Sequence, residues 1–115
     1  MQHICQLSDI DDGQAKAFEH PTLPNRTIFI VRQNQQAWAY LNMCPHMGVE
    51  MEFQKNKFMS FDGTQIQCAM HGALFDIATG FCSWGPCSGQ SLMGIEIENQ
   101  NGVLFFKQDG YDDEI

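Results

Sequence analysis

The chain has 115 residues and a formal net charge of -8, and 43% of its residues are apolar. A chain of this length folds as one domain, and its apolar content favours a globular protein over a disordered one. The acidic balance excludes nucleic acid and anionic membrane surfaces as main partners, because both require clustered positive charge.

The first part of the chain predicts four short strands. Residues 1–7 favour a strand, and the turn-forming stretch SDIDDG follows at 8–13. Residues 14–20 fit either a strand or a single helical turn, and we favour the strand. The β-branched and aromatic runs at 27–32 and 37–42 are separated by QNQQ and predict a hairpin.

The middle of the chain has a weaker periodic signal. Residues 43–64 show no steady period, so we expect a loop there. The stretch TQIQCAM at 64–70 predicts a strand. DIATG at 76–80 predicts a turn, in which the Asp76 carboxylate accepts backbone N–H bonds and Gly80 takes a positive φ.

The last third contains the clearest local pattern. CSWGPCSG at 82–89 is typical of a loop, whereas isoleucine and glutamate alternate at the start of 94–107. Asn101-Gly102 then predicts a type I′ turn into the run VLFF. We expect the acidic tail at 109–115 to fray. These elements indicate an all-β domain of small antiparallel sheets.

Two short motifs pair a cysteine with a histidine. Cys44 and His46 lie in MCPHMG, and Cys68 and His71 lie in CAMHG. Thiolate and imidazole are metal ligands, so the two pairs predict a metal or cluster site. The four side chains could hold one tetrahedral Zn²⁺, although zinc fingers group Cys with Cys and His with His. One Cys and one His per loop suit a binuclear iron centre in which each iron takes like ligands from both loops.

The ligand spacing, Cys-x-His with Cys-x-x-His, resembles that of the Rieske [2Fe-2S] family, and the similarity covers nearly the whole chain. The resemblance implies a Rieske fold of three stacked antiparallel sheets in one domain (1–115), with a small cluster-binding subdomain at about 43–91. It also rests on shared flanking features: a Gly after each His, the Phe75-Asp76 pair, the ATG turn (78–80) and the proline-containing loop GPCSG (85–89).

The same resemblance assigns the ligands of one [2Fe-2S] cluster. It implies that Cys44 and Cys68 bind one iron through sulfur, and that His46 and His71 bind the other through a ring nitrogen. We expect these four residues to form the cofactor and metal site, and we expect no catalytic residue.

The residues around the ligands favour a low reduction potential. Rieske proteins of cytochrome bc complexes carry a disulfide between the ligand loops, at positions that resemble Val49 and Met70 here. They also place hydroxyl donors to the cluster sulfurs where this chain has Ala73 and Phe75. Fewer donors stabilise the reduced cluster less, so we expect a potential toward the lower end of the Rieske range, about -150 mV.

The resemblance implies a one-electron carrier and not an enzyme. We expect a ferredoxin component that passes electrons from a reductase to a Rieske-type non-haem oxygenase. The oxygenase reaction itself needs a mononuclear iron held by two His and a carboxylate, and only His3 and His20 remain for it. The alternative is a small Rieske-like subunit of a nitrite reductase-type complex, although such relatives often lack some of the ligands.

No signal-peptide pattern or membrane-length apolar run is apparent, so we expect a cytoplasmic protein with reduced thiols. Cys5 fits a small buried apolar residue. Cys82 and Cys87 could pack in the core, form a disulfide or act as a redox-sensitive pair. Trp84 could cover the cluster or present a contact surface.

Overall fold

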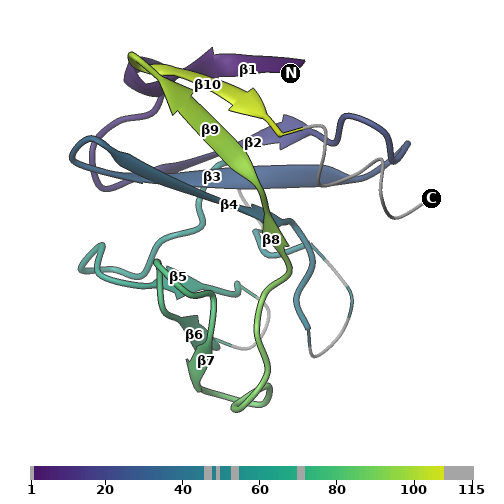
Figure 1. Ribbon diagram of the computed structural model, residues 1–115. Helices are drawn as coiled ribbons and strands as arrows, with labels where there is room; N and C mark the ends of the chain where they lie inside the picture. The colour runs from purple at the N-terminus through teal and green to yellow at the C-terminus, as the bar shows by residue number, and fades with distance from the viewer. Residues whose placement is uncertain (1, 46–47, 49, 53–54, 70–71, 108–115) are drawn as a thin grey trace.

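The described part of the chain folds into three antiparallel sheets in the computed structural model (Figure 1). Residues 2–45, 48, 50–52, 55–69 and 72–107 are described. The first sheet has the order β1-β10-β9, the second β2-β3-β4-β8 and the third β5-β6-β7. The strand bounds are β1 Gln2–Gln6, β2 Ala15–Glu19, β3 Thr27–Gln33, β4 Gln36–Leu41, β5 Ile66–Gln67, β6 Leu74–Phe75, β7 Cys82–Trp84, β8 Gly94–Ile95, β9 Ile97–Gln100 and β10 Val103–Phe106.

The all-β class and the three antiparallel sheets are thus confirmed. The single helical element among the described residues is a 3-10 turn, η1 (Leu7–Asp9), between β1 and β2. No described helix has the length and apolar character needed to cross a membrane.

Strand β3 lies at the centre of the fold because both of its faces are buried. Phe29 and Val31 face the ligand-side core, the buried cluster that also contains Cys44 and Cys68. Ile28 and Ile30 face the opposite core, the buried cluster that also contains Cys5. All four side chains are fully buried, which explains the continuous apolar run where a half-exposed strand would alternate. In Figure 1 the second sheet accordingly lies between the first sheet above and the third sheet below.

The strands predicted before residue 43 and after residue 93 are present. Strands β3 and β4 form the expected hairpin, in which Gln33 pairs with Gln36. Asn101 and Gly102 have φ values of 55° and 89°, as a type I′ turn requires. The segment 94–107 is more than a hairpin, however: β8 pairs with β4 in the second sheet, while β9 pairs with β10 in the first. The chain therefore passes from one sheet to the next at Glu96.

The third sheet differs from expectation in two places. The segment 82–89 is not wholly a loop, because Cys82–Trp84 forms β7 and pairs with β6. The strand expected over 64–70 is shorter, since only Ile66–Gln67 pairs. Strands of two or three residues are set by partners distant in the sequence, so they leave almost no local pattern. The tail at 109–115 lies outside the described residues.

Candidate metal centre

The first cysteine motif forms a tight turn just beyond the end of β4. The Cys44 side chain is buried, and its carbonyl accepts a hydrogen bond from the Gly48 N–H at 2.7 Å. Gly48 has a φ of 73°, which an L-residue adopts only with strain. The glycine that follows the histidine in sequence therefore closes the turn. His46, between the two, lies outside the described residues.

The second motif has the same construction. Cys68 directly follows β5 and is fully buried. Its carbonyl accepts a hydrogen bond from the Gly72 N–H at 2.9 Å, and Gly72 has a φ of 69°. The Cys68 N–H donates to the Ala73 carbonyl at 2.9 Å, which ties the turn to the start of β6. His71 lies outside the described residues.

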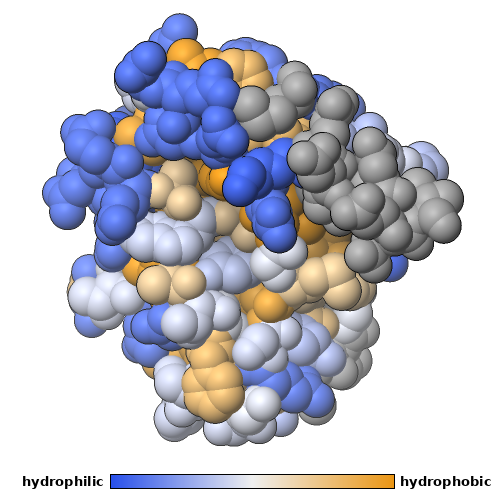
Figure 2. All heavy atoms as spheres, viewed as in Figure 1, coloured by the Kyte–Doolittle hydropathy of each residue, from blue (hydrophilic) through white to orange (hydrophobic). Residues whose placement is uncertain are grey.

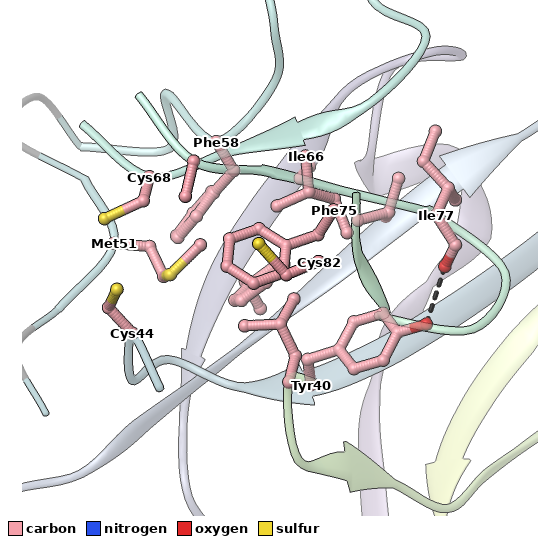
Figure 3. Close-up of a cluster of buried hydrophobic side chains, with 14 of the residues drawn as sticks. Tyr40, Cys44, Met51, Phe58, Ile66, Cys68, Phe75, Ile77 and Cys82 are labelled. Atoms are coloured by element: carbon pink, nitrogen blue, oxygen red, sulfur yellow. Dashed lines mark hydrogen bonds between the residues drawn. The ribbon is translucent and has the colours of Figure 1, made fainter. Parts of the chain in front are cut away.

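The two turns are joined to one another. The Ala69 N–H donates a 2.7 Å hydrogen bond to the Met51 carbonyl, so the chain beyond the first motif contacts the residue after Cys68. Figure 3 shows the Cys44 and Cys68 sulfur atoms at the same edge of the ligand-side core, with Met51 beside them. The structure thus brings together the two predicted thiolate ligands from segments far apart in the sequence.

An apolar wall lies behind the two sulfur atoms (Figure 3). Met51, Phe58 and Phe75 are each fully buried there, and the Phe58 ring stacks on Phe29 with centroids 4.4 Å apart. Ala73 is also buried. This surrounding excludes water from the protein side of the site and, at Ala73 and Phe75, presents no hydroxyl.

The turn after β6 is anchored to the second sheet by a tyrosine. The Tyr40 hydroxyl donates to the Ile77 carbonyl at 2.6 Å, and burial, followed by the nearby Asp76 charge, raises the pKa of Tyr40 to about 12. The Asp76 carboxylate accepts from the Thr79 N–H at 2.9 Å, and Gly80 has a φ of 74°, as the DIATG pattern predicted. A Cβ on Gly80 would lie 2.7 Å from the Tyr40 ring.

A third loop, residues 85–91, packs against the second motif. A Cβ on Gly85 would lie 2.8 Å from the Ala73 Cα, so the two backbones are in direct contact. The loop residue Cys87 contacts Cys82 of β7: their sulfur atoms are 3.1 Å apart, and both residues are thiols. Cys87 donates to Cys82, and Cys82 donates to the Trp84 carbonyl at 3.3 Å.

Burial, and then the hydrogen bond and charge of Cys82, raise the pKa of Cys87 to about 12. A thiol with this pKa stays protonated at neutral pH, so Cys87 is a poor nucleophile. The arrangement agrees with the packing interpretation of the pair. Cys5 is buried in the opposite core, and burial raises the pKa of its thiol to about 11.

In the described part of the site, the donor atoms fit an iron–sulfur cluster. Within the described residues no group of three or more His, Cys, Asp and Glu could hold a metal ion, because two of the four predicted ligands, His46 and His71, lie outside them. The two cysteines nevertheless come from similar turns and reach one edge of the core, which is what a cluster held by two loops requires.

Sequence reasoning missed Asn42, the residue two positions before Cys44. Among the described residues it is the buried polar one, with 2% of its surface exposed. Its signal in the sequence is weak: an asparagine at the end of the apolar strand AWAYL also fits an ordinary turn.

Comparison with known proteins identifies the family. The Rieske [2Fe-2S] domain profile matches residues 1–110, whereas no curated protein matches the chain. The ferredoxin of carbazole 1,9a-dioxygenase from Nocardioides aromaticivorans IC177 is 18% identical with a TM-score of 0.71, covering 90% of this chain and 93% of that one. The Sphingomonas yanoikuyae B1 ferredoxin is 24% identical with a TM-score of 0.72, covering 92% and 96%.

A third similar structure is described as a complex of reduced oxygenase and oxidized ferredoxin in carbazole 1,9a-dioxygenase. It is 23% identical with a TM-score of 0.72, covering 90% of this chain and 89% of that one. These structures confirm the fold, and the profile covers nearly the whole sequence. The chain therefore belongs to the Rieske [2Fe-2S] domain family, whose members carry an iron–sulfur cluster.

Proposed function

We propose that this chain is a one-electron carrier that holds one [2Fe-2S] cluster through Cys44, His46, Cys68 and His71. The observation that carries the proposal is the pair of similar turns that bring the two cysteine sulfurs to one edge of the ligand-side core. A cluster bound there would supply one-electron redox chemistry. The chain's own contribution is to hold the thiolates, exclude water from one side and shape the surface for a partner.

We propose that residues of about 43–91 act as the cluster-binding subdomain. Both cysteine turns, the third sheet and the third loop belong to this stretch. The first and second sheets, which pack around the opposite core, then serve as the base that supports it. Function and docking would thus be confined to one end of the molecule.

The distribution of charge supports docking at that end. From residue 63 to residue 95 the chain has a single Asp, Glu, Lys or Arg, namely Asp76, although its net charge is -8. Figure 2 agrees: strongly hydrophilic residues gather over the upper part, whereas the part over β5–β7 is mostly pale or orange. An uncharged surface over the cluster lets a redox partner approach without removing water from charged groups.

By fold similarity, we propose a reductase and a Rieske-type non-haem oxygenase as the redox partners, with transfer in the cytoplasm. One similar structure contains a ferredoxin and an oxygenase together, which supports a partner of that kind. The purified protein should be red-brown and should give an EPR signal after reduction. A colourless protein with bound zinc would refute the proposal in favour of a structural zinc module.

Voltammetry near neutral pH should give a reversible one-electron wave toward the lower end of the Rieske range, about -150 mV. The physical reason is the apolar surroundings: Ala73 and Phe75 are buried and offer no hydroxyl to a cluster sulfur. Ala73→Ser should raise the midpoint, because a hydroxyl at this position could stabilise the more negative reduced state. A strongly positive midpoint for the unaltered protein would contradict this expectation.

Trp84→Ala should slow electron transfer to a Rieske-type oxygenase about tenfold, the effect expected for a central aromatic contact. Trp84 is 61% exposed on the edge strand β7, and its ring lies 3.9 Å from the position of a Cβ on Gly72, beside the second motif. Stopped-flow mixing of reduced protein with oxidised oxygenase measures the rate. Leu23→Ala is the control, because Leu23 is exposed but lies before β3 in the base. An equal effect of both variants would exclude a specific role for Trp84.

A further inference from the structure

Asn42 connects the two ends of the first ligand loop, which runs from Cys44 to Met51. Its Oδ1 accepts a hydrogen bond from the Met51 N–H at 2.8 Å, and its Nδ2 donates to Glu52 Oε1 at 2.8 Å. The same Nδ2 donates to Thr27 Oγ1 at 3.0 Å, and the Asn42 N–H donates to the Thr27 carbonyl at 2.9 Å. One side chain therefore fastens the segment that starts at Cys44 and ends at Met51 to the central strand β3.

The second ligand loop is attached to the same point. The Met51 residue that donates to Asn42 also accepts, through its carbonyl, the 2.7 Å hydrogen bond from the Ala69 N–H. Ala69 is the residue after Cys68. A continuous path of hydrogen bonds thus runs from Asn42 through Met51 to the neighbour of the second cysteine.

Glu52 determines which hydrogen-bonding groups the side chain at position 42 must supply. One carboxylate oxygen accepts from Asn42, and the other accepts from the Asn56 N–H at 3.3 Å. The Asn56 Oδ1 in turn accepts from the Ala17 N–H of the edge strand β2 at 2.8 Å. Because a carboxylate only accepts, residue 42 must supply a donor toward Glu52 and an acceptor toward Met51, and an amide side chain does both.

We propose that Asn42 is the positioning residue of the cluster site: it sets the separation of the Cys44 and Cys68 loops and, through that, how firmly and in what electronic state the cluster is held. Asn42 acts through Met51 and Ala69, the two residues that continue the hydrogen-bond path toward Cys68. The inference rests on the proposed function, since it assigns a role toward the same cluster.

The test exchanges donor and acceptor between the two partners. Asn42→Asp keeps an acceptor for the Met51 N–H but removes the donor and places two carboxylates together. The double variant Asn42→Asp/Glu52→Gln restores the hydrogen bond with reversed polarity and leaves the net charge unchanged. Glu52→Gln alone is the matched control: its carbonyl still accepts from Asn42, and the variant loses only the longer 3.3 Å hydrogen bond from the Asn56 N–H.

Asn42→Asp should release iron about tenfold faster than the unaltered protein, the cost of one charge-assisted hydrogen bond in a partly buried site. It should also shift the EPR g-values of the reduced cluster and speed amide hydrogen exchange in peptides that contain Met51 and Ala69. The double variant should return all three properties close to their original values. Glu52→Gln should change each of them less than Asn42→Asp does.

Lower stability of Asn42→Asp with unchanged g-values and unchanged exchange at Ala69 would overturn the inference, because Asn42 would then be only a structural residue. Failure of the double variant to rescue would also overturn it. The proposed function is tested separately, by whether the unaltered protein carries a cluster at all. If the protein carries no cluster, hydrogen exchange at Met51 and Ala69 still reports on the hydrogen-bond path.

Discussion

Replacing Cys44 or Cys68 with serine should abolish the visible absorption of the cluster and reduce bound iron to background. Iron in such clusters is held by soft thiolates, and a serine hydroxyl is a harder donor that remains protonated at neutral pH. Both side chains are buried at the edge of the ligand-side core, where a serine hydroxyl would also lack the sulfur's polarisable contacts. Iron per chain and the absorption spectrum measure the effect directly.

Cys5→Ser is the matched control for these variants. Cys5 is equally a buried thiol, but it belongs to the opposite core, and its raised pKa of about 11 keeps it protonated. We expect it to lower stability slightly and to leave iron content unchanged. Loss of iron in Cys5→Ser, or its retention in Cys44→Ser, would contradict the assignment of the ligands. His46→Ala and His71→Ala extend the test to the two proposed ligands that lie outside the described residues.

The sequence predicted the parts of the fold that carry a local signal. The hairpin of β3 and β4 was visible as two β-branched runs around a polar turn, and Asn101-Gly102 specified the turn before β10. The placement of β8 and β9 in different sheets was not visible. Strand pairing depends on which backbone lies alongside, and no local pattern in 94–107 records that β4 is the partner of β8.

At the candidate site, too, the sequence predicted the local motifs but not the contacts between distant segments. The spacing of the four predicted ligands and the glycine after each histidine identified the motifs, because rare residue types repeat there in one pattern. The structure adds the reason for the glycines, since Gly48 and Gly72 close both turns at positive φ. The role of Asn42 and the close approach of Gly85 to Ala73 depend on contacts between segments that are distant in the sequence, so no local pattern predicts these contacts.

Gly85→Ala should destabilise the protein by about 3 kcal/mol and weaken cluster retention as well. The φ of Gly85 is 111°, where an L-residue is strained, and a Cβ there would lie 2.8 Å from the Ala73 Cα. Backbone strain and overpacking each cost about 1–3 kcal/mol, and a backbone atom cannot move aside as a flexible side chain does. Urea unfolding, followed by fluorescence, measures the change in the free energy of unfolding.

The effect should reach the cluster because Ala73 is part of the second ligand turn. Its carbonyl accepts the hydrogen bond from the Cys68 N–H, so pushing Ala73 away from the third loop disturbs Cys68 directly. Gly89→Ala is the matched control: Gly89 lies in the same loop with a φ of 91°, but a Cβ there meets no atom within 4 Å. It should cost only the backbone strain, about 1 kcal/mol, and leave the visible spectrum unchanged. Equal losses in the two variants would show that strain alone matters and that the contact between Gly85 and Ala73 does not support the cluster site.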